Sequence, residues 1–492
     1  MEHAQAIAPA EIESISDKKV EEIYPNSFQS DKHFYPKVLN ATIHPLVSYF
    51  MRMKSSQIIN RYCHLNPQVS QQTLEELLNY QAKYLRWAGT DLFYVTTSTG
   101  NRQMLVIETN SSPSGQKSMP LFTEYKELGG YSELVEHTFA PGLKSSKCKQ
   151  GELAVVYDKN YMEASGYAAA MADYFDKPIL LAPFENQSKN PVVRFEDGVM
   201  QIYKSGVWVP IKGAIRYVTQ KPWNRIPLDT KTFIINPILG CLAGGRNKQL
   251  AAIAYELFNA ELKNSGLAII SPETIRNVGK HEVPLYVKSL GGYAVIKVPY
   301  SNAGQGVYTI TSEKELDEFM DQDHEYNLFI VQALVGNYKW SSNGSHGIFY
   351  HVGTVPNKHS EIFVADLRMM ISSGVEGFRP LAVYGRRTRV PLADVLDESI
   401  SSWDMLGTNL SVNHGNDSWS RETNRLLLAD RKDFNILGLG LDDLIKAFIQ
   451  SVLATIAIDK MAGNLINKKG KFRHKLFRSL NNDQNFLEEI IF

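Results

Sequence analysis

The chain has 492 residues, of which 43% are hydrophobic and 21% charged, values ordinary for a soluble globular enzyme of two to four structural units. Basic residues (Lys and Arg) and acidic residues (Asp and Glu) both number 52, so no overall basic field exists to attract nucleic acid. The three cysteines form no C-x-x-C pair, and their odd number argues against a disulfide framework.

The hydropathy of the chain predicts a cytoplasmic protein without a membrane partner. The first residues, MEHAQAIAPAEIESISDKK, lack the basic and apolar regions of a signal peptide. The most apolar late stretch, Ser451 to Ile458, is too short to span a bilayer. A reducing compartment is the simpler interpretation of three unpaired cysteines. Residues 1–45, polar at their start and without periodicity, are expected to form a mobile N-terminal extension.

The first predicted elements are a helix and a β-hairpin. Residues 71–88 carry apolar side chains at helical spacing, and Gly89 is expected to end this helix. Strands are predicted at 91–95 and 104–107, on either side of the turn TSTGN.

The second of these strands ends in two oxygen-bearing side chains, Glu108 and Asn110. Because side chains two positions apart on a strand point to the same side, they would present a carboxylate and an amide oxygen together. Such a pair suits Mg²⁺, although an ordinary polar strand end is the alternative. A glycosylation sequon also begins at Asn110, but such sequons are used only in secreted chains.

The middle of the chain alternates strands and helices and predicts an α/β unit. GELAVVYD is expected to be a strand, EASGYAAAMADYF a helix, PILLAPF a strand, and RFEDGVMQIYKSGVWVPI two short strands. A helix is expected from Gln249 to Leu262, and a short strand at 268–270.

A lysine followed by a glycine-containing turn marks the stretch GYAVIKVPYSNAGQGVYTI. Strands are predicted from Tyr293 to Lys297 and from 307 to 310. Gly304 and Gly306 would let backbone N–H groups approach phosphates closely, and the lysine would add a positive charge. The stretch is neither a Walker A loop nor a dinucleotide fingerprint, and an ordinary β-turn is the alternative.

The remaining elements extend to the end of the chain. Ser312 and Glu315 have capping-box spacing at the start of a helix. Further elements are strands at LFIVQAL, EIFVADLRMMIS and RPLAVYGRRT and a long helix from Asp442 to about Met461. For Arg386, Arg387 and Arg389, a position on the solvated surface and a contact with phosphate both stay open. A solvated tail is expected at KKGKFRHKLFR. His346 and His351 are interpreted as loop and strand residues.

The order of these features resembles the ATP-grasp superfamily of carboxylate ligases. Lys248 at a helix start and Lys297 on a strand are similar to the two lysines that hold ATP phosphates in that family. Four further features follow in the family's order. They are a flap, a hinge strand that offers backbone groups to adenine, a D-[IL]-R strand ending in Arg368 and an asparagine loop (TNLS). The resemblance implies these nucleotide-binding residues: Lys248, Lys297, Ser301, Asn302, Gly304, Gln305, Gly306, Gln332, Ala333, Leu334 and Asn409.

The metal motif stands in an unusual place relative to these blocks. In ordinary members it follows them, whereas here the only similar run is GTDLFYVTTSTGNRQMLVIETNSSPSG, which resembles the metal strand pair of D-alanine–D-alanine ligases. The resemblance therefore implies a circularly permuted ATP-grasp fold, related to glutathionylspermidine-synthetase-like amide ligases, with Asp91, Glu108 and Asn110 as Mg²⁺ ligands. Permutation is tolerated when termini lie close and joints fall in surface loops.

The resemblance implies five parts after the extension at 1–45. A permuted segment with the metal motif (46–148) is followed by an α/β domain of the kind that normally precedes the ATP-grasp core (149–245). A lysine and flap subdomain (246–330), a central subdomain (331–465) and a tail (466–492) complete the chain. The implied activity is ATP- and Mg²⁺-dependent activation of a carboxylate as an acyl phosphate that an amine attacks. Lys297 and Arg368 would be catalytic, and Lys117 and Ser118 would contact the substrate carboxylate.

The acid and the amine would be small molecules or peptides, and the resemblance leaves a homodimer open. A non-catalytic, nucleotide-binding ATP-grasp protein is the alternative function, because the flap has no longer glycine run and no carboxylate follows Asp404 in the asparagine loop. Phosphoryl transfer to a non-carboxylate acceptor also stays open.

Overall fold

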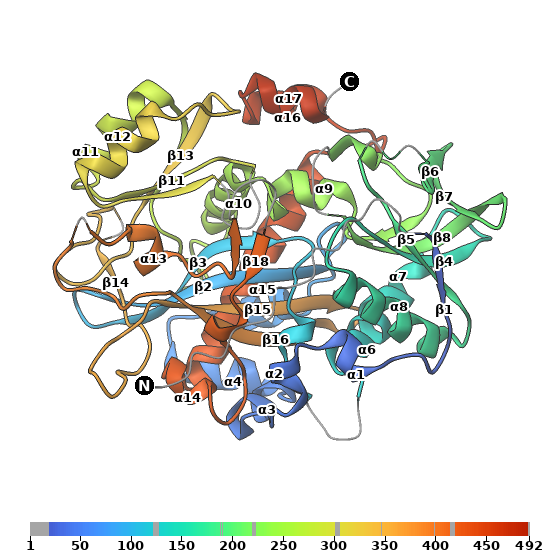
Figure 1. Cartoon of the computed structure of the whole chain (residues 1–492), viewed down its shortest axis with the longest axis horizontal. Coiled ribbons are helices and arrows are strands. Elements are labelled where there is room, and N and C mark those ends of the chain that lie inside the picture. Colours follow the sequence, from blue (N-terminus) through green and yellow to red (C-terminus); the bar gives the residue numbers. More distant parts are fainter. Residues whose placement is uncertain are drawn as a thin grey trace, which may run out of the picture.

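The computed structural model describes residues 19–121, 127–186, 188, 190–218, 223–300, 306–345, 347–397, 399–413 and 419–490. Over these residues the fold is mixed α/β, with three larger sheets, a two-stranded ribbon and helices packed against them (Figure 1). The predicted class is therefore correct. Among the described residues, no helix combines the length and the apolar character needed to cross a membrane.

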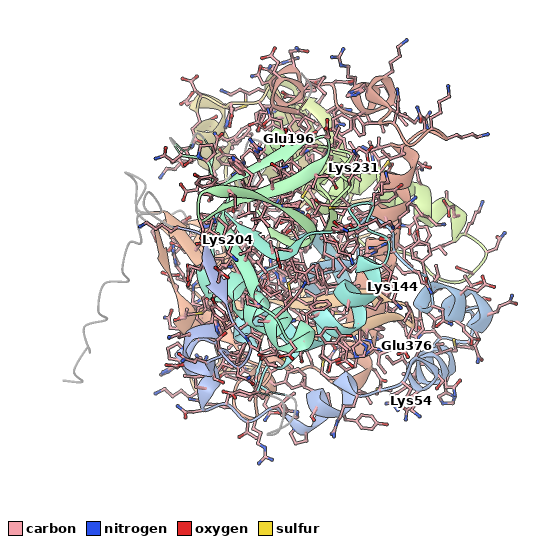
Figure 2. All side chains as sticks on the ribbon, turned by 90° about the vertical axis from the view of Figure 1, so that its right-hand side faces the viewer. Lys54, Lys144, Glu196, Lys204, Lys231 and Glu376 are labelled. Atoms are coloured by element: carbon pink, nitrogen blue, oxygen red, sulfur yellow. The ribbon has the colours of Figure 1, made fainter. Side chains whose placement is uncertain are left out.

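The α/β unit on the right of Figure 1 is built on a sheet with a parallel core. Helix α8 (Tyr161–Phe175) joins two of the parallel strands and is buried from Glu163 to Ala172, where small and apolar residues predominate. Where the sequence predicts two short strands, the structure has three, since the chain continues as an antiparallel meander; Figure 2 faces this unit, with Glu196 and Lys204 on the meander. In pairing order the strands are β1 (Glu21–Ile23), β5 (Ile179–Pro183), β4 (Glu152–Tyr157), β8 (Val207–Tyr217), β7 (Val199–Lys204) and β6 (Val193–Glu196), with β9 (Phe233–Ile235) beside β8.

The central sheet joins distant parts of the chain. The early hairpin β2 (Trp87–Thr97) and β3 (Arg102–Asn110) pairs through β2 with the late strand β15 (Ala365–Gly374). Helix α15 (Leu441–Asn464) packs against this sheet along a largely apolar surface. The sheet is completed by β14 (Phe349–His351), β16 (Gly377–Arg387) and β19 (Leu426–Leu427).

A smaller sheet carries Lys297 and has its own apolar core. Its strands, in pairing order, are β10 (Thr274–Gly279), β13 (Leu328–Ala333), β11 (Ala294–Lys297) and β12 (Val307–Ile310), and its helices are α11 (Val283–Ser289) and α12 (Glu313–Asp321). The Ser312 hydroxyl accepts a hydrogen bond from the backbone N–H of Glu315 at 3.3 Å, as the capping pattern predicts. The Glu315 carboxylate instead accepts from Thr311, one residue before the cap.

The helix predicted at 71–88 is shorter than expected. Helix α5 (Gln71–Leu78) ends early because the buried Asp459 carboxylate of α15 accepts the backbone N–H groups of Lys83, Tyr84 and Leu85. Gly89 therefore lies inside β2 rather than at a helix end, and a Cβ there would meet Pro113 at 2.4 Å. The helix expected from Gln249 is α10 (Lys248–Glu261).

The strand predicted at 268–270 is absent, because these residues are bound one by one to other elements. The Ile270 carbonyl accepts from Val106 N–H at 2.7 Å, and its N–H donates to Gln450 at 2.9 Å.

The chain contains further helical segments, which are α3 (Pro45–Met51), α4 (Ser55–Leu65), η2 (Gln116–Ser118), α6 (Gly130–Leu134), η3 (Val135–Phe139), α7 (Ala140–Leu143), η4 (Trp223–Arg225), α9 (Ile238–Gly240), η5 (Cys241–Gly245), η6 (Lys280–Glu282), α13 (Ser402–Leu406), η7 (Thr423–Arg425) and α14 (Phe434–Leu437). The two-stranded ribbon consists of β17 (Ser411–Asn413) and β18 (Trp419–Arg421).

The N-terminal extension expected at 1–45 is folded from residue 19 onward. β1 pairs with β5 at the sheet edge, and α1 (Ser30–His33) and α2 (Pro36–Leu39) follow. The Phe34 ring is buried against Tyr131, at 5.7 Å between ring centroids. Long-range apolar contacts, which local periodicity does not reveal, hold this segment in place.

The tail expected at 466–492 is also folded through residue 490. Helices α16 (His474–Leu480) and α17 (Gln484–Ile490) bury Phe477 and Phe486, and both lie beside the lysine-bearing sheet (Figure 1). The basic residues of this stretch, such as Lys475, face solvent, while the phenylalanines between them fill the core. The charge of the segment is thus a property of one face only.

Candidate functional site

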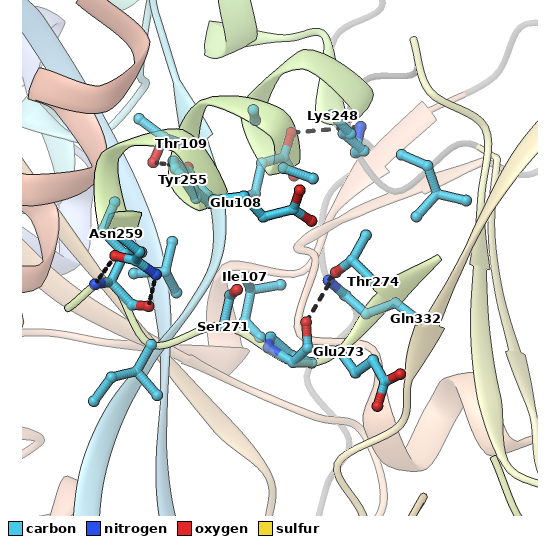
Figure 3. Close-up of a pocket in the computed structure, with 18 of the residues that line it drawn as sticks. Ile107, Glu108, Thr109, Lys248, Tyr255, Asn259, Ser271, Glu273, Thr274 and Gln332 are labelled. Carbon is cyan, nitrogen blue, oxygen red and sulfur yellow. Dashed lines mark hydrogen bonds and ion pairs between the residues drawn. The ribbon is translucent and has the colours of Figure 1, made fainter. Parts of the chain in front are cut away.

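A cavity of about 560 Å³ lies between β3, α10, the 268–274 segment and the lysine-bearing sheet. This volume is within the range of about 300–1,000 Å³ that small-molecule sites occupy. Figure 3 shows Glu108 and Lys248 on one side and Thr274 and Gln332 on another. Four of the predicted residues, Glu108, Lys248, Lys297 and Gln332, line this one cavity although they come from four different elements, β3, α10, β11 and β13.

Lys297 stands at the end of β11 and is 6% exposed. Its Nζ donates a hydrogen bond to Gln332 Oε1 at 2.6 Å, and Gln332 is fixed in turn through its Nε2 to Thr274 Oγ1 at 2.8 Å. Burial lowers the pKa of Lys297 to about 8, with Lys248 acting in the same direction and Glu108 opposing it. The lysine is therefore a cation held in a fixed position with a weakened hold on its proton.

Lys248 is the first residue of α10, where the Asn247 side chain caps the helix by accepting from Leu250 N–H at 3.0 Å. The Lys248 backbone N–H donates to Pro299 O at 3.0 Å, which ties this helix start to the chain just after β11. Its Nζ lies 3.5 Å from Glu108 Oε1. The two lysines and the carboxylate thus form one charged group.

The C-terminal helices support both lysine-bearing elements. Asn481 Oδ1 accepts from Asn247 Nδ2 at 2.9 Å and also from the Tyr300 hydroxyl. Gln249 Nε2 donates to Leu480 O at 2.8 Å. The segment expected to be a solvated tail therefore fixes the start of α10 and the chain after β11.

Asp91, predicted to bind metal, is instead an ion-pair residue. Arg368 on the neighbouring strand donates to both of its oxygens, from Nε at 2.6 Å and from Nη2 at 2.7 Å, and Arg386 Nη2 lies 3.0 Å from Oδ2. Burial alone would raise the pKa of Asp91, but the two guanidinium groups outweigh it and lower the pKa to about 2. In this arrangement the carboxylate is not available to a metal ion.

Arg368, predicted to be catalytic, has its donors engaged by the same network. Besides Asp91 it donates to Ser114 O from Nη1 at 3.2 Å. Arg386 donates to Asp366 from Nε at 2.9 Å, and the Thr408 hydroxyl donates to Asp366 at 2.7 Å. The predicted D-L-R strand is therefore present as β15, but its arginine stabilises a buried network beside the cavity rather than lining it.

The predicted substrate residues lie in a buried loop against the α/β unit. Lys117 is 2% exposed, bonds to Asn160 and lies 3.7 Å from Glu163. Glu163 on α8 also accepts the backbone N–H groups of Gly115 and Gln116, at 2.8 and 2.9 Å. Ser118 is buried in the same turn. No sequence signal pointed to Glu163, because it falls within a helix of a separate unit.

The predicted hinge contributes a side chain rather than backbone groups. The N–H of Ala333 donates to Glu273 O at 2.9 Å, and that of Leu334 donates to Ser342 Oγ at 2.7 Å. Only Gln332 of the three lines the cavity. Asn409 is not among the described residues that line it; its Nδ2 donates to Ser411 O at 3.4 Å and its carbonyl accepts from Arg425.

The predicted flap falls mostly outside the described residues, which exclude Ser301, Asn302, Gly304 and Gln305 as well as His346. Gly306 is described, adopts a φ of +65° and accepts from Val298 N–H at 2.7 Å. His351 lies on β14 as predicted, and burial lowers its pKa to about 3, so the ring is neutral.

Residues that the sequence did not single out also border this region. Tyr255 on α10 donates to Thr109 Oγ1 at 2.9 Å, which joins α10 to β3 (Figure 3). Arg246 precedes Lys248 by two positions, and Trp223 lies beneath its guanidinium at 5.7 Å. The only signal for Arg246 was its place in GGRNK, just before a predicted helix.

Comparison with known proteins gives matches among solved structures alone. No protein-family model matches the chain, and no curated protein matches it in sequence. The chain is similar to a glutathione synthetase-like effector from Globodera pallida, with 8% identity and a TM-score of 0.38 over 75% of this chain and 87% of the other. It is similar to a RimK domain ATP-grasp protein from Sphaerobacter thermophilus, with 12% identity and a TM-score of 0.27 over 50% of this chain and 92% of the other.

Both TM-scores lie below 0.5, so the function proposed next rests on the residues of this chain. The permuted order of the blocks stays a prediction.

Proposed function

We propose that the protein is an ATP- and Mg²⁺-dependent ligase of the ATP-grasp type that joins a carboxylate to an amine. The observation that carries the proposal is the meeting of Glu108, Lys248 and Lys297 at one cavity. Two buried or half-buried cations beside a carboxylate suit a metal-bound polyphosphate, whose negative charge they would neutralise. The acid and amine would be small molecules or peptides.

The residues at the end of β3 fit a magnesium ion in part. Glu108 faces the cavity, whereas Asn110, two positions on, is not among the described residues that line it. The described residues contain no cluster of three His, Cys, Asp or Glu that could hold a metal by itself. Mg²⁺ commonly takes one or two protein ligands and completes its shell with phosphate oxygens and water, so Glu108 and the Asn110 amide oxygen would suffice. When bound, the ion would neutralise phosphate charge.

The central sheet supports the proposed permutation. Asp91 on β2 is the direct partner of Glu108 on β3 and of Arg368 on β15, so residues from distant parts of the chain stand at one level of one sheet. In a permuted ATP-grasp fold, the hairpin that carries the metal motif would have to pair with the D-L-R strand, as β2 does with β15.

In the proposed reaction the chain acts mainly by positioning. Lys248 and Lys297 would hold the phosphates while the γ-phosphoryl group moves to the carboxylate, a step that needs alignment and charge neutralisation more than covalent help. The fixed Gln332 would keep Lys297 aimed at the transferring group. An amine would then displace phosphate from the activated acid.

The test is release of ADP and phosphate across a panel of amino acids, small peptides and polyamines with Mg²⁺. We expect at least one acid–amine pair to give turnover in the natural protein and none in a Glu108→Ala, Lys297→Ala double variant. Lys288→Ala, an exposed change on α11, is the matched control and should keep full activity. If no pair exceeds the double variant, the ligase proposal is wrong.

A second candidate is a nucleotide-binding protein without ligase activity. It is favoured by the ion pairs that hold Arg368, the residue predicted to be catalytic. Calorimetry with Mg-ATP distinguishes the two candidates, since tight binding without turnover by any pair would support this one.

The proposal also predicts a pH dependence of nucleotide affinity. Lys297 has a pKa of about 8, and the charged form is the one that binds phosphate. The charged fraction of the free protein falls between pH 7 and 9, so the affinity for Mg-ATP should fall about tenfold. Lys297→Arg stays charged over this range and should flatten the profile. A profile that is equally steep in the variant would contradict the assignment.

A further inference from the structure

Arg246 is a buried cation without a polar partner. It follows η5, just before α10, and is 8% exposed. No described residue accepts a hydrogen bond from its guanidinium, and Nη1 is fully enclosed without a partner. The Trp223 ring lies beneath the guanidinium, with its centroid 5.7 Å from the guanidinium carbon. Burial lowers its pKa from the ordinary arginine value, which reflects the cost of keeping this charge out of water.

Other buried arginines among the described residues donate to carboxylates, carbonyls or sulfur, which sets Arg246 apart. Arg216, 0% exposed, donates from Nε to Asn236 O at 2.7 Å, from Nη1 to Val218 O at 2.5 Å and from Nη2 to Cys241 Sγ at 3.2 Å. Arg368 and Arg386 are paired with carboxylates. Burying an arginine costs folding free energy unless its donors are satisfied. A bound molecule could therefore supply the partner that Arg246 lacks.

Two further buried donors in this region are unsatisfied. Trp223 Nε1 and Asn110 Nδ2 are enclosed and have no hydrogen-bond partner in the part of the chain that the structure describes. Asn110 immediately precedes Ser111, whose N–H donates to Gly245 O at 3.0 Å, so the backbones of Asn110 and Arg246 flank this bond. Each of these groups is a donor, so the partner that each lacks is an acceptor, and the positive charge of Arg246 calls for an anion.

Arg246 lies next to the cavity, and this position indicates where the anion would be. Gly244 and Lys248, two positions before and after it, both line the cavity. Glu108 and Asp158 lie near enough to act on the charge of Arg246, but Asp158 is paired with Arg225 at 3.0 Å, and Glu108 with Lys248. The free guanidinium thus stands just beyond the lysines proposed to hold phosphates, on the side of the α/β unit.

We propose that Arg246, with Trp223 beneath it, binds the carboxylate of the acid substrate. The inference deepens the proposed ligase function and rests on it. It assigns to Arg246 the carboxylate contact that the sequence resemblance gives to Lys117 and Ser118, both of which are buried in their own turn. A guanidinium suits this task because its planar fork matches the two oxygens of a carboxylate.

The first experiment measures the thermal stability of the full chain without ligand. Arg246→Met removes an unpaired buried charge and should raise the melting temperature by about 1–3 °C. The matched control Arg216→Met removes a bonded arginine and should lower the melting temperature. If Arg246→Met lowers it as Arg216→Met does, Arg246 is structural and the inference is wrong.

The second experiment measures binding by calorimetry in the presence of a saturating, non-hydrolysable Mg-ATP analogue. The probes are acetate, succinate and glutamate, with succinamide as the uncharged control. At least one carboxylate should bind the natural protein, and Arg246→Gln should weaken it tenfold or more, whereas Arg246→Lys should restore part of the affinity. Affinity for the nucleotide analogue should stay within twofold in these variants.

The outcomes separate this inference from the ligase proposal. If the analogue binds but no carboxylate does, or if Arg246→Gln leaves carboxylate binding unchanged, the inference is overturned while nucleotide binding stands. If Arg246→Gln weakens the analogue instead of the carboxylate, Arg246 belongs to the phosphate site and the inference is also overturned. Failure of the analogue to bind the natural protein would overturn both proposals.

Discussion

Asp91→Asn is expected to lower the free energy of unfolding by about 3–5 kcal/mol, because it leaves two buried guanidinium groups without their shared counter-charge. Arg368 and Arg386 both contact this carboxylate, and all three side chains are at most 12% exposed. Asparagine keeps the shape and one acceptor, so the loss reflects charge rather than a cavity. Urea unfolding of the full chain at neutral pH, compared with the natural protein, measures the difference.

A surface ion pair provides the control for this prediction. Arg61 and Asp442 lie 2.5 Å apart, but both are more than a third exposed, so Asp442→Asn should change stability by less than about 1 kcal/mol. The sign of the pH dependence is also fixed. The pKa of Asp91 is lowered to about 2, so its stabilisation is complete above its unfolded pKa near 4 and is lost as the pH falls toward 2. Equal losses at Asp91 and Asp442 would argue against the buried network.

Phe477→Ala should cost about 3–5 kcal/mol of stability, the usual effect of emptying a fully buried phenylalanine site. The ring is 0% exposed and lies 5.3 Å from Phe472 and 6.3 Å from Phe486, between centroids. Since α16 and α17 also hold Asn247 and Tyr300 through Asn481, Mg-ATP binding should weaken together with stability. Thermal unfolding and calorimetry on the same samples give both quantities.

The exposed neighbour Lys475 on the same helix supplies the comparison. Lys475→Ala should stay within about 0.5 kcal/mol of the natural protein, as surface changes generally do. It should also leave Mg-ATP affinity unchanged. An unchanged melting temperature in Phe477→Ala would show that the C-terminal helices are dispensable, and that the sequence-based expectation of a tail was the better description.

Local signals predicted a large part of the fold. β12 has the predicted bounds, and β11, α10 and α8 each lie within two residues of prediction, because apolar periodicity and caps act over a few neighbouring residues. Where a distant residue intervenes, the prediction failed. Asp459 takes the backbone N–H groups that would have continued the helix at 71–88, and nothing within that segment signals a carboxylate almost four hundred residues away.

The candidate site likewise combines features that local sequence predicts with features that depend on distant residues. Order and spacing alone predict that a carboxylate and an amide end one strand, that a lysine ends another and that a second lysine begins a helix. The folding of distant segments onto one another sets which of these groups meet and which are held elsewhere. It brings Glu108, Lys248 and Lys297 to one cavity, engages Asp91 and Arg368 with each other, and gives the Arg246 guanidinium no hydrogen-bond acceptor among the described residues. The physical reason is that the availability of a charge depends on its partners, and those partners come from elements distant in the chain.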